Sequence, residues 1–329
     1  MIHRGLCGAL SLSVAFAVLV GCGGQAAPGA LPERRAVAQH LIARSWMLAD
    51  LSGNDLLYVA NTASDSGPAN VYAFSYPDGT LVGTLTGFVN PKGICADKSG
   101  DVFITDEDGY EVVEYAHGGT SPIQVLADAH EPTSCSVDMK SGKLAVLNRD
   151  HSASVYKHAA GAPTTYATPF MPYFAAYDNR GDLFIDGYAN PFAVAELVKG
   201  GSSFQSVSLE EHTRGFQPAG LQWNVGLLAL GSANPYQYAC CGRFFRYDIA
   251  GSIGVKTGSH GIRGSLSDFY IYGSNVIVTD GSSSIDVYSY PRGKTPIQTI
   301  KEPGHTSYGV TISIAQTHPR RSRTVVRSD

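Results

Sequence analysis

Short apolar runs alternate with turn residues along the chain, and one such run recurs six times. Successive copies are 39 to 48 residues apart, at residues 57–61, 102–106, 144–148, 183–187, 228–232 and 276–280. A period near 40–45 residues is typical of one four-stranded propeller blade. The pattern therefore predicts six repeats, with this run as the second strand of each.

The flanking segments repeat in the same phase. A strand and a tight turn precede the recurring run, as at residues 93–100, where Asp97 lies three residues before Gly100. An aromatic-bearing strand such as 71–74 follows the run. A fourth strand then begins near proline, as at 121–126 and 295–300, and this fits an outer edge that needs no ladder donor there.

These elements predict an all-β fold, a six-bladed β-propeller with four-stranded blades over residues 45–316. Residues 46–50 and 309–313 both match the innermost strand of a blade. One of these two terminal strands should therefore close the ring by completing a blade begun at the other end of the chain.

The run from Pro91 to Asp106 has the form Pro-x-Gly-Ile-x-x-Asp-x-x-Gly, followed by an apolar strand ending in Asp. It resembles the repeat of the NHL and gluconolactonase-like propellers. The resemblance extends from about Trp46 to Ser313 and implies the fold. It does not imply one activity, because these folds serve many functions.

The first 21 residues predict a signal peptide, with a short positive start at His3 and Arg4 and an apolar run over 6–20. The sequence Leu-Val-Gly-Cys at 19–22 resembles a bacterial lipobox, which implies lipid attachment at Cys22. The alternative is an ordinary signal peptide with Cys22 as a bystander. Residues 22–44 would then be a lipid-anchored linker rich in Gly, Ala and Pro.

These features place the chain in the bacterial cell envelope, bound to a membrane through its N-terminal lipid. Gly23 stands where an inner-membrane signal has Asp, which favours the outer membrane, facing the periplasm. Residues 317–329 form a basic tail. We expect this tail to be disordered, with contact to anionic lipid headgroups as the alternative.

Composition and net charge limit the classes of partner that we expect this chain to bind. Charged residues make up 16% of the chain, below the usual share of about 25%. The net charge of −4 gives no electrostatic reason to expect nucleic acid. The remaining candidates are a membrane, a small ligand or an envelope protein.

Polar side chains cluster at the loops that should surround the mouth of the central channel, namely the ends of the second strands and the segments before the inner strands. The candidate ligand or metal ring is Asn61, Asp106, His130, Asn148, Asp186, Asn190, His260, Asp280 and His305. Such side chains can bind a divalent cation or polarise a substrate. The alternative is that Asp and Asn cap turns and that the histidines are solvated.

Two functions follow from these interpretations. The leading one is a non-enzymatic scaffold that binds a ligand or protein through the channel mouth. The alternative is a metal-dependent hydrolase or lyase similar to the gluconolactonases. That family has a Glu at the start of its first inner strand, whereas residues 45–48 contain no carboxylate, so only Asn148 and Asp280 could match its ligand positions.

Four cysteines remain after Cys7 and Cys22 are set aside. Cys95 and Cys135 lie on neighbouring inner strands, one step out of register, so they could face each other and form a disulfide in the oxidising envelope. The adjacent Cys240 and Cys241 follow the second strand of the fifth repeat and could form a vicinal disulfide. Free thiols are the alternative for both pairs.

Overall fold

The computed structural model describes residues 44–62, 69–188, 192–210, 215–233, 242–304 and 306–315. The chain divides into two compact units, Met1–Leu41 and Ile42–Asp329, and all described residues belong to the second. In these ranges every regular element is a β-strand, and there is no helix long and apolar enough to cross a membrane.

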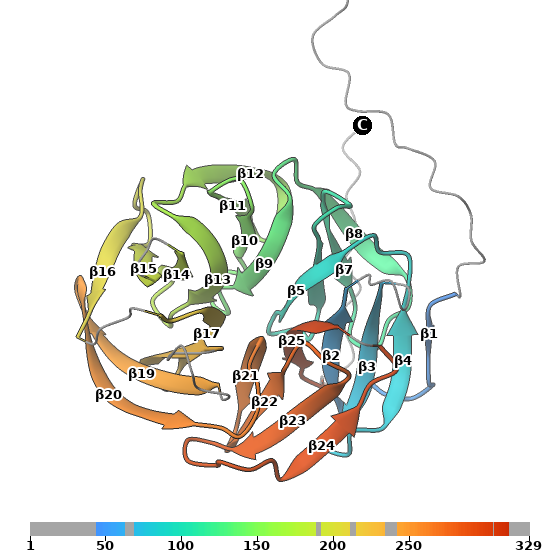
Figure 1. Cartoon of the computed structure of the whole chain (residues 1–329). Helices are drawn as coiled ribbons and strands as arrows, with labels where there is room; N and C mark the ends of the chain where they lie inside the picture. The colour runs from blue at the N-terminus through green and yellow to red at the C-terminus, as the bar shows by residue number, and fades with distance from the viewer. Residues whose placement is uncertain are drawn as a thin grey trace, which may run out of the picture. The chain divides into compact units, whose positions relative to one another are not determined.

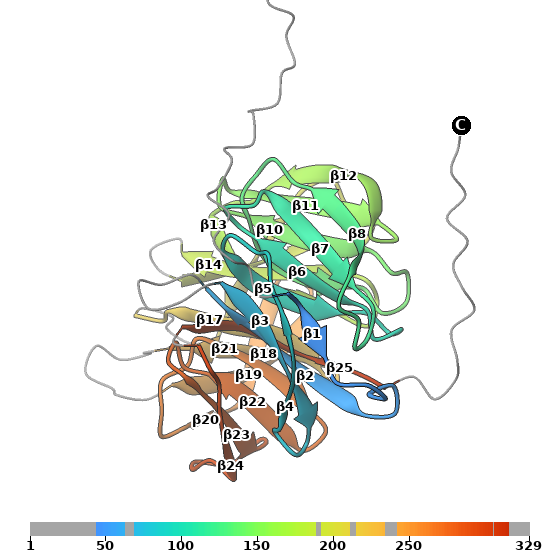
Figure 2. The same ribbon diagram turned by 90° about the vertical axis from the view of Figure 1, so that its right-hand side faces the viewer.

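The strands are arranged in a ring around a central axis (Figures 1 and 2). The six recurring runs are confirmed as the second strand of successive antiparallel groups: β2 (Asp55–Asn61), β6 (Val102–Asp106), β10 (Leu144–Asn148), β14 (Leu183–Tyr188), β18 (Leu227–Ser232) and β22 (Asn275–Thr279). The strands on the inside of the ring are β5 (Pro91–Ala96), β9 (Pro132–Val137), β13 (Met171–Tyr177), β17 (Pro218–Asn224), β21 (Asp268–Tyr272) and β25 (Ser307–Ser313).

Outside each second strand come a third and a fourth strand. The third strands are β3 (Asn70–Tyr76), β7 (Glu111–Tyr115), β11 (Ser152–Lys157), β15 (Phe192–Leu197), β19 (Arg243–Ala250) and β23 (Ser284–Ser289). The fourth strands are β4 (Leu81–Leu85), β8 (Pro122–Ala127), β12 (Ala160–Ala167), β16 (Gln205–Leu209), β20 (Ile253–Gly261) and β24 (Gln298–Lys301).

The sequence predicts six separate four-stranded sheets, whereas the described strands form five sheets. The difference arises in the eight-stranded sheet, where two antiparallel runs, β13–β16 and β17–β20, are joined by parallel pairing of β16 with β20. That pairing is short, linking Ser208 to Ile253 and Leu209 to Gly254. Two fourth strands at the outer edge thus satisfy each other's exposed backbone groups.

The C-terminal strand closes the ring. β25 pairs antiparallel with β2 along four consecutive positions, from Leu56–Ser313 to Val59–Val310, and takes the innermost place in that sheet. The competing N-terminal segment is instead β1 (Trp46–Met47), an additional outer strand paired with β4. The C-terminal strand takes the buried position, since Val310 and Ile312 are buried while Trp46 is 43% exposed.

Apolar packing between neighbouring strand groups holds the ring together. Within the described residues, the buried apolar side chains form six clusters. One cluster joins Tyr58 of β2 to Ile94 of β5, and another joins Leu57 of β2 to Ile277 of β22. Neighbouring sheets thus bury apolar side chains against one another, while outer-strand residues such as Ile123 and Val125 stay exposed.

The predicted Asp-x-x-Gly turns are present at the end of the inner strands. Asp178 Oδ1 accepts hydrogen bonds from the backbone N–H groups of Arg180, Gly181 and Asp182, each at 2.8 Å. Gly181 has a φ of +92°, which side chains rarely tolerate. These turns lie at the opposite end of the strands from the channel mouth discussed below.

Candidate functional site

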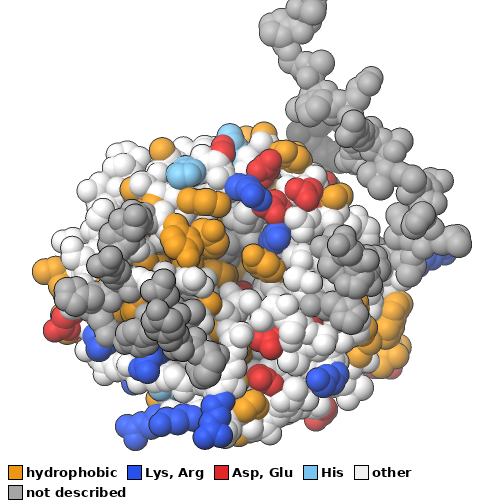
Figure 3. Space-filling view, in the orientation of Figure 1, with side chains coloured by type: hydrophobic (Ala, Val, Ile, Leu, Met, Phe, Trp, Pro, Cys, Tyr) orange, Lys and Arg blue, Asp and Glu red, His pale blue; other side chains and the backbone are white. Residues whose placement is uncertain are grey.

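The channel mouth contains a cavity of about 190 Å³ near the starts of the inner strands. Its charged lining is Lys92, Glu107, Arg149 and Asp268, and its aromatic lining includes Tyr173 and Tyr308. Figure 3 shows this face, where charged and hydrophobic side chains adjoin near the centre. A polar group with an apolar neighbour is the usual composition of a ligand site.

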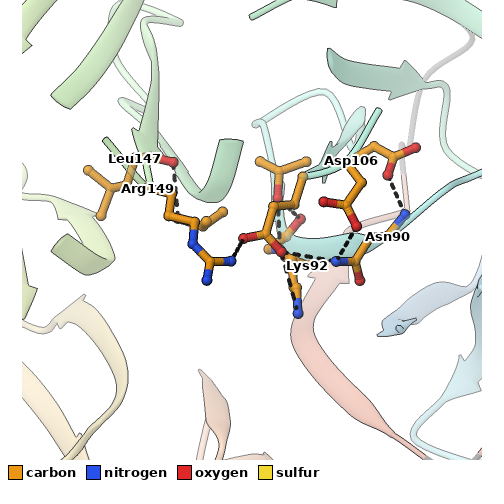
Figure 4. Close-up of polar contacts among 10 residues, drawn as sticks. Asn90, Lys92, Asp106, Leu147 and Arg149 are labelled. Carbon is orange, nitrogen blue, oxygen red and sulfur yellow. Dashed lines mark hydrogen bonds and ion pairs between the residues drawn. The ribbon is translucent and has the colours of Figure 1, made fainter. Parts of the chain in front are cut away.

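Glu107 holds the two cations in place. Its Oε1 lies 2.8 Å from Arg149 Nη1 and its Oε2 lies 3.6 Å from Lys92 Nζ. Asn90 Nδ2 also donates to Oε2 at 3.0 Å. The Glu107 side chain is 6% exposed, whereas that of Arg149 is 58% exposed. The buried carboxylate therefore positions the two cations, as Figure 4 shows for Asn90, Lys92 and Arg149.

Aromatic rings border the cations. The Lys92 ammonium lies 4.3 Å from the centre of the Tyr308 ring, a cation–π distance. Tyr173 packs edge-on against Tyr188 with ring centres 5.6 Å apart. Tyr188 and Tyr308 remain 44% and 39% exposed, so the rim offers aromatic surface to a binding partner.

A second cavity, of about 160 Å³, lies in the channel and is lined by inner strands of every strand group. Asp268 borders both cavities. Its Oδ1 accepts from the Phe269 N–H at 2.8 Å and its Oδ2 from the Val310 N–H at 3.3 Å. Burial nevertheless raises the pKa of Asp268 to about 7, because the ring excludes bulk water from the charged form.

The strand-end members of the ring proposed from sequence serve local structure. Asp106 accepts the Val89 and Asn90 N–H groups at 2.8 and 2.6 Å. Asn148 Nδ2 donates to two serine hydroxyls, those of Ser152 and Ser154. These contacts tie loops to strand ends.

Asn61, Asp186 and Asp280 also hydrogen-bond within the protein, Asn61 to a residue far away in the chain. Asn61 donates to Glu302 at 3.3 Å, and Asp280 accepts from the Ser282 N–H at 2.9 Å. Asp186 is fully buried and accepts from Phe174 N–H, and desolvation raises its pKa well above the ordinary value. None of these three residues lines the mouth cavity.

The sequence places His260 in a loop before an inner strand, and that placement is wrong. That residue lies near the end of strand β20 rather than in a loop, because the fourth strand of the fifth group is nine residues long. Its ring stacks on Phe244 at 5.1 Å, and burial lowers its pKa to about 4. His130 does lie in a loop, with Nδ1 2.6 Å from Asp150 Oδ2.

Several predicted residues lie outside the described ranges, namely Cys22, Asn190, Cys240, Cys241 and His305. Among the residues that the structure describes, no group of three or more His, Cys, Asp or Glu side chains is placed to hold a metal ion. The predicted disulfide between Cys95 and Cys135 is present, with Cα atoms 5.8 Å apart. It links β5 to β9 and lines the channel.

Two residues of the mouth cavity that were not predicted from sequence each come one position after a predicted residue in the chain. Glu107 follows Asp106, and Arg149 follows Asn148. Successive residues leaving a strand point in different directions, so the buried strand end caps the loop while the next side chain reaches the cavity. A charged residue immediately after the second strand of a repeat was the sequence signal that could have identified Glu107 and Arg149.

Comparison with known proteins supports the fold but does not assign the chain to a family. No protein-family model matches the chain, and no curated protein matches it. A solved structure titled as a nidogen/laminin complex contains a chain that is 16% identical, with a TM-score of 0.63, covering 80% of this chain and 99% of its own. A Kuenenia stuttgartiensis hydrazine synthase chain matches at 13% identity and a TM-score of 0.49, covering 61% of this chain and 63% of its own. The first of these likenesses supports a β-propeller fold.

Proposed function

We propose that this β-propeller is a binding scaffold that recognises a ligand or an envelope protein through its channel mouth. The observation that carries this proposal is the mouth cavity, where Glu107 holds Arg149 and Lys92 beside exposed tyrosines. Arginine and tyrosine are enriched at the energetically important centres of protein interfaces.

The nidogen/laminin structure is a complex of proteins, and a protein partner for this chain is consistent with it. At 16% identity that likeness concerns the fold alone, so the partner of this chain is a separate question. The mouth residues, rather than the neighbour's identity, define the surface to test.

We further infer that the ring has six blades. The merged sheet contains two complete antiparallel runs of four strands, joined only through the residue pairs that begin at Ser208 and Leu209. The six buried clusters of the described residues separate six such runs. On this count β25 and β1 give the first blade five strands.

The proposed location is the bacterial outer membrane, with Cys22 carrying the lipid and residues 22–44 acting as the linker. The lipobox-like residues 19–22 support this proposal. The Cys95–Cys135 bond is consistent with it, because disulfides persist in oxidising compartments.

The scaffold proposal is tested by cross-linking the purified protein to envelope extract and comparing variants by quantitative mass spectrometry. Arg149→Ala and Tyr308→Ala should each reduce the recovery of a specific partner by about tenfold or more, as expected for a residue at the centre of an interface. Arg180→Ala is the matched control, since Arg180 is an exposed, ion-paired arginine in a turn at the opposite end of the strands. Equal recovery with all three variants would contradict binding at the mouth.

A further inference from the structure

The mouth cavity carries opposite charges on different strand groups. Lys92 and Arg149, from the groups of β5 and β9, lie on one side of its lining, and Asp268 comes from the start of β21. The cavity volume of about 190 Å³ is below the roughly 300–1,000 Å³ of pockets for drug-sized molecules. The occupant must therefore be small.

The cations have capacity for an additional anion. Within the described residues, the ion pairs of Lys92 and Arg149 all go to one carboxylate, that of Glu107. The contact from Arg149 uses Nη1, and a guanidinium carries five N–H donors in a fork that suits a carboxylate. A ligand carboxylate bound here would accept hydrogen bonds from the guanidinium donors of Arg149 that do not contact Glu107.

Asp268 is the residue of the cavity lining that would bind a positively charged group. Its carboxyl accepts two backbone N–H groups, and across the described ranges no Lys, Arg or His lies within ion-pair distance of it. A ligand ammonium would neutralise this carboxyl, and the tyrosine faces of the same cavity favour a cation as well.

The surrounding charges disfavour a purely anionic ligand. Asp108 and Glu131 both interact electrostatically with Arg149 from the rim. Together with Asp268 and Glu107 they outnumber the two cations. The apolar part of the lining, Met171, Pro172, Tyr173 and Phe174, suits a hydrophobic body between the two charged ends.

We propose that the mouth cavity binds a small zwitterion of the amino-acid type, with its carboxylate on Arg149 and Lys92, its ammonium toward Asp268 and its apolar body against Tyr173. This assignment rests on the proposed function and names the ligand class of the same site.

Three matched probes separate the two charges. L-phenylalanine carries both, N-acetyl-L-phenylalanine keeps only the carboxylate, and 2-phenylethylamine, whose alkylamine stays protonated at pH 8, keeps only the ammonium. Calorimetric titration of the whole protein at pH 8, where Asp268 is mainly ionised, should give at least about tenfold tighter binding for the zwitterion than for either single-charge probe.

Two variants test which residue binds each charged end of the ligand. Arg149→Gln should remove the preference for phenylalanine over 2-phenylethylamine, while Asp268→Asn should remove its preference over the N-acetyl compound. Arg180→Gln, an ion-paired arginine in a distant turn, should leave all three affinities unchanged. Circular dichroism of each variant verifies that the fold is retained.

Equal binding of the three probes to the wild-type protein, or binding of none, would overturn the proposal. The scaffold function fails separately, because it depends on the cross-linking result. A mouth-dependent protein partner without probe binding would leave the scaffold standing and reject the zwitterion.

Discussion

Glu302 is a buried carboxyl group with incomplete hydrogen bonding. Its Oε1 accepts from Asn61 Nδ2, whereas its Oε2 is buried and has no hydrogen-bond partner among the described residues. Burial, with a smaller contribution from Asp280, raises the pKa of Glu302 to about 8. The ionised form is therefore disfavoured in the folded protein.

This raised pKa predicts a loss of stability with increasing pH. Between the unfolded pKa of about 4.3 and the folded pKa of about 8, the folded state keeps a proton that the unfolded state has released, so stability falls as the pH rises through this window. Glu302→Gln should remove this contribution and make the protein more stable than wild type at pH 8.5, by up to a few kcal/mol. Urea denaturation at pH 5 and pH 8.5 measures the difference.

The difference between wild type and variant is the quantity to compare, since Asp186 and Asp268 add pH dependence of the same sign. Asp78→Asn, at an exposed position, serves as the control for an acid-to-amide change. A Glu302→Gln variant with the wild-type pH dependence would show that Glu302 ionises normally.

The residues of the channel mouth show which members of the candidate site could be predicted from sequence. The strand ends Asp106 and Asn148 were identifiable as polar positions in the repeat, but the structure uses them to fasten loops. Asp268 was not identified, because the pattern placed His260 in the loop before the last inner strand, whereas β20 continues to Gly261 and β21 begins at Asp268. Residue spacing within one repeat does not reveal this displacement, because a longer fourth strand keeps the same alternation of side chains.

At the scale of elements, ring closure by β25 predicts unequal effects of truncation. Removing residues 304–329 deletes β25, exposes the core edge of β2 and should prevent folding. Among the described residues, removing 22–50 deletes one strand, the two-residue outer strand β1, and this should leave a folded ring. Circular dichroism and thermal melting of both truncated proteins provide the measurement.

The two truncations control for each other, because each removes a terminal segment of similar length. If the protein lacking 304–329 melted cooperatively at the wild-type temperature, closure through β25 would be disproved. A shorter deletion of residues 317–329, which spares β25, should have no effect on melting.

The Cys95–Cys135 bond joins two neighbouring inner strands across 40 residues. Cross-linking a loop of this length restricts the unfolded chain, so replacing both cysteines with serine should lower stability by about 2–4 kcal/mol. Chemical denaturation with and without a reductant measures the effect. The reductant should destabilise the wild-type protein and have little effect on the double variant, and an equal response would assign the redox sensitivity to other cysteines.

At the scale of the whole molecule, the proposed lipid anchor predicts a change in location. Cys22→Ser should release the protein from the membrane into the soluble periplasmic fraction, because the acylated thiol is lost. Fractionation with immunoblotting measures this partition, and Cys95→Ser is a control that leaves the anchor intact. A Cys22→Ser protein that remained in the membrane fraction would contradict the anchor.

The sequence by itself determined the β-propeller repeat and the positions of the second strands. These features depend on period, alternation and turn chemistry, which act between residues close in the chain. Only the tertiary structure decided that β25 closes the ring, that β16 pairs with β20, and that Glu107, Arg149 and Asp268 meet at one cavity. These outcomes depend on contacts between distant strand groups, where small differences in burial and strand length choose among arrangements that the local pattern leaves equivalent.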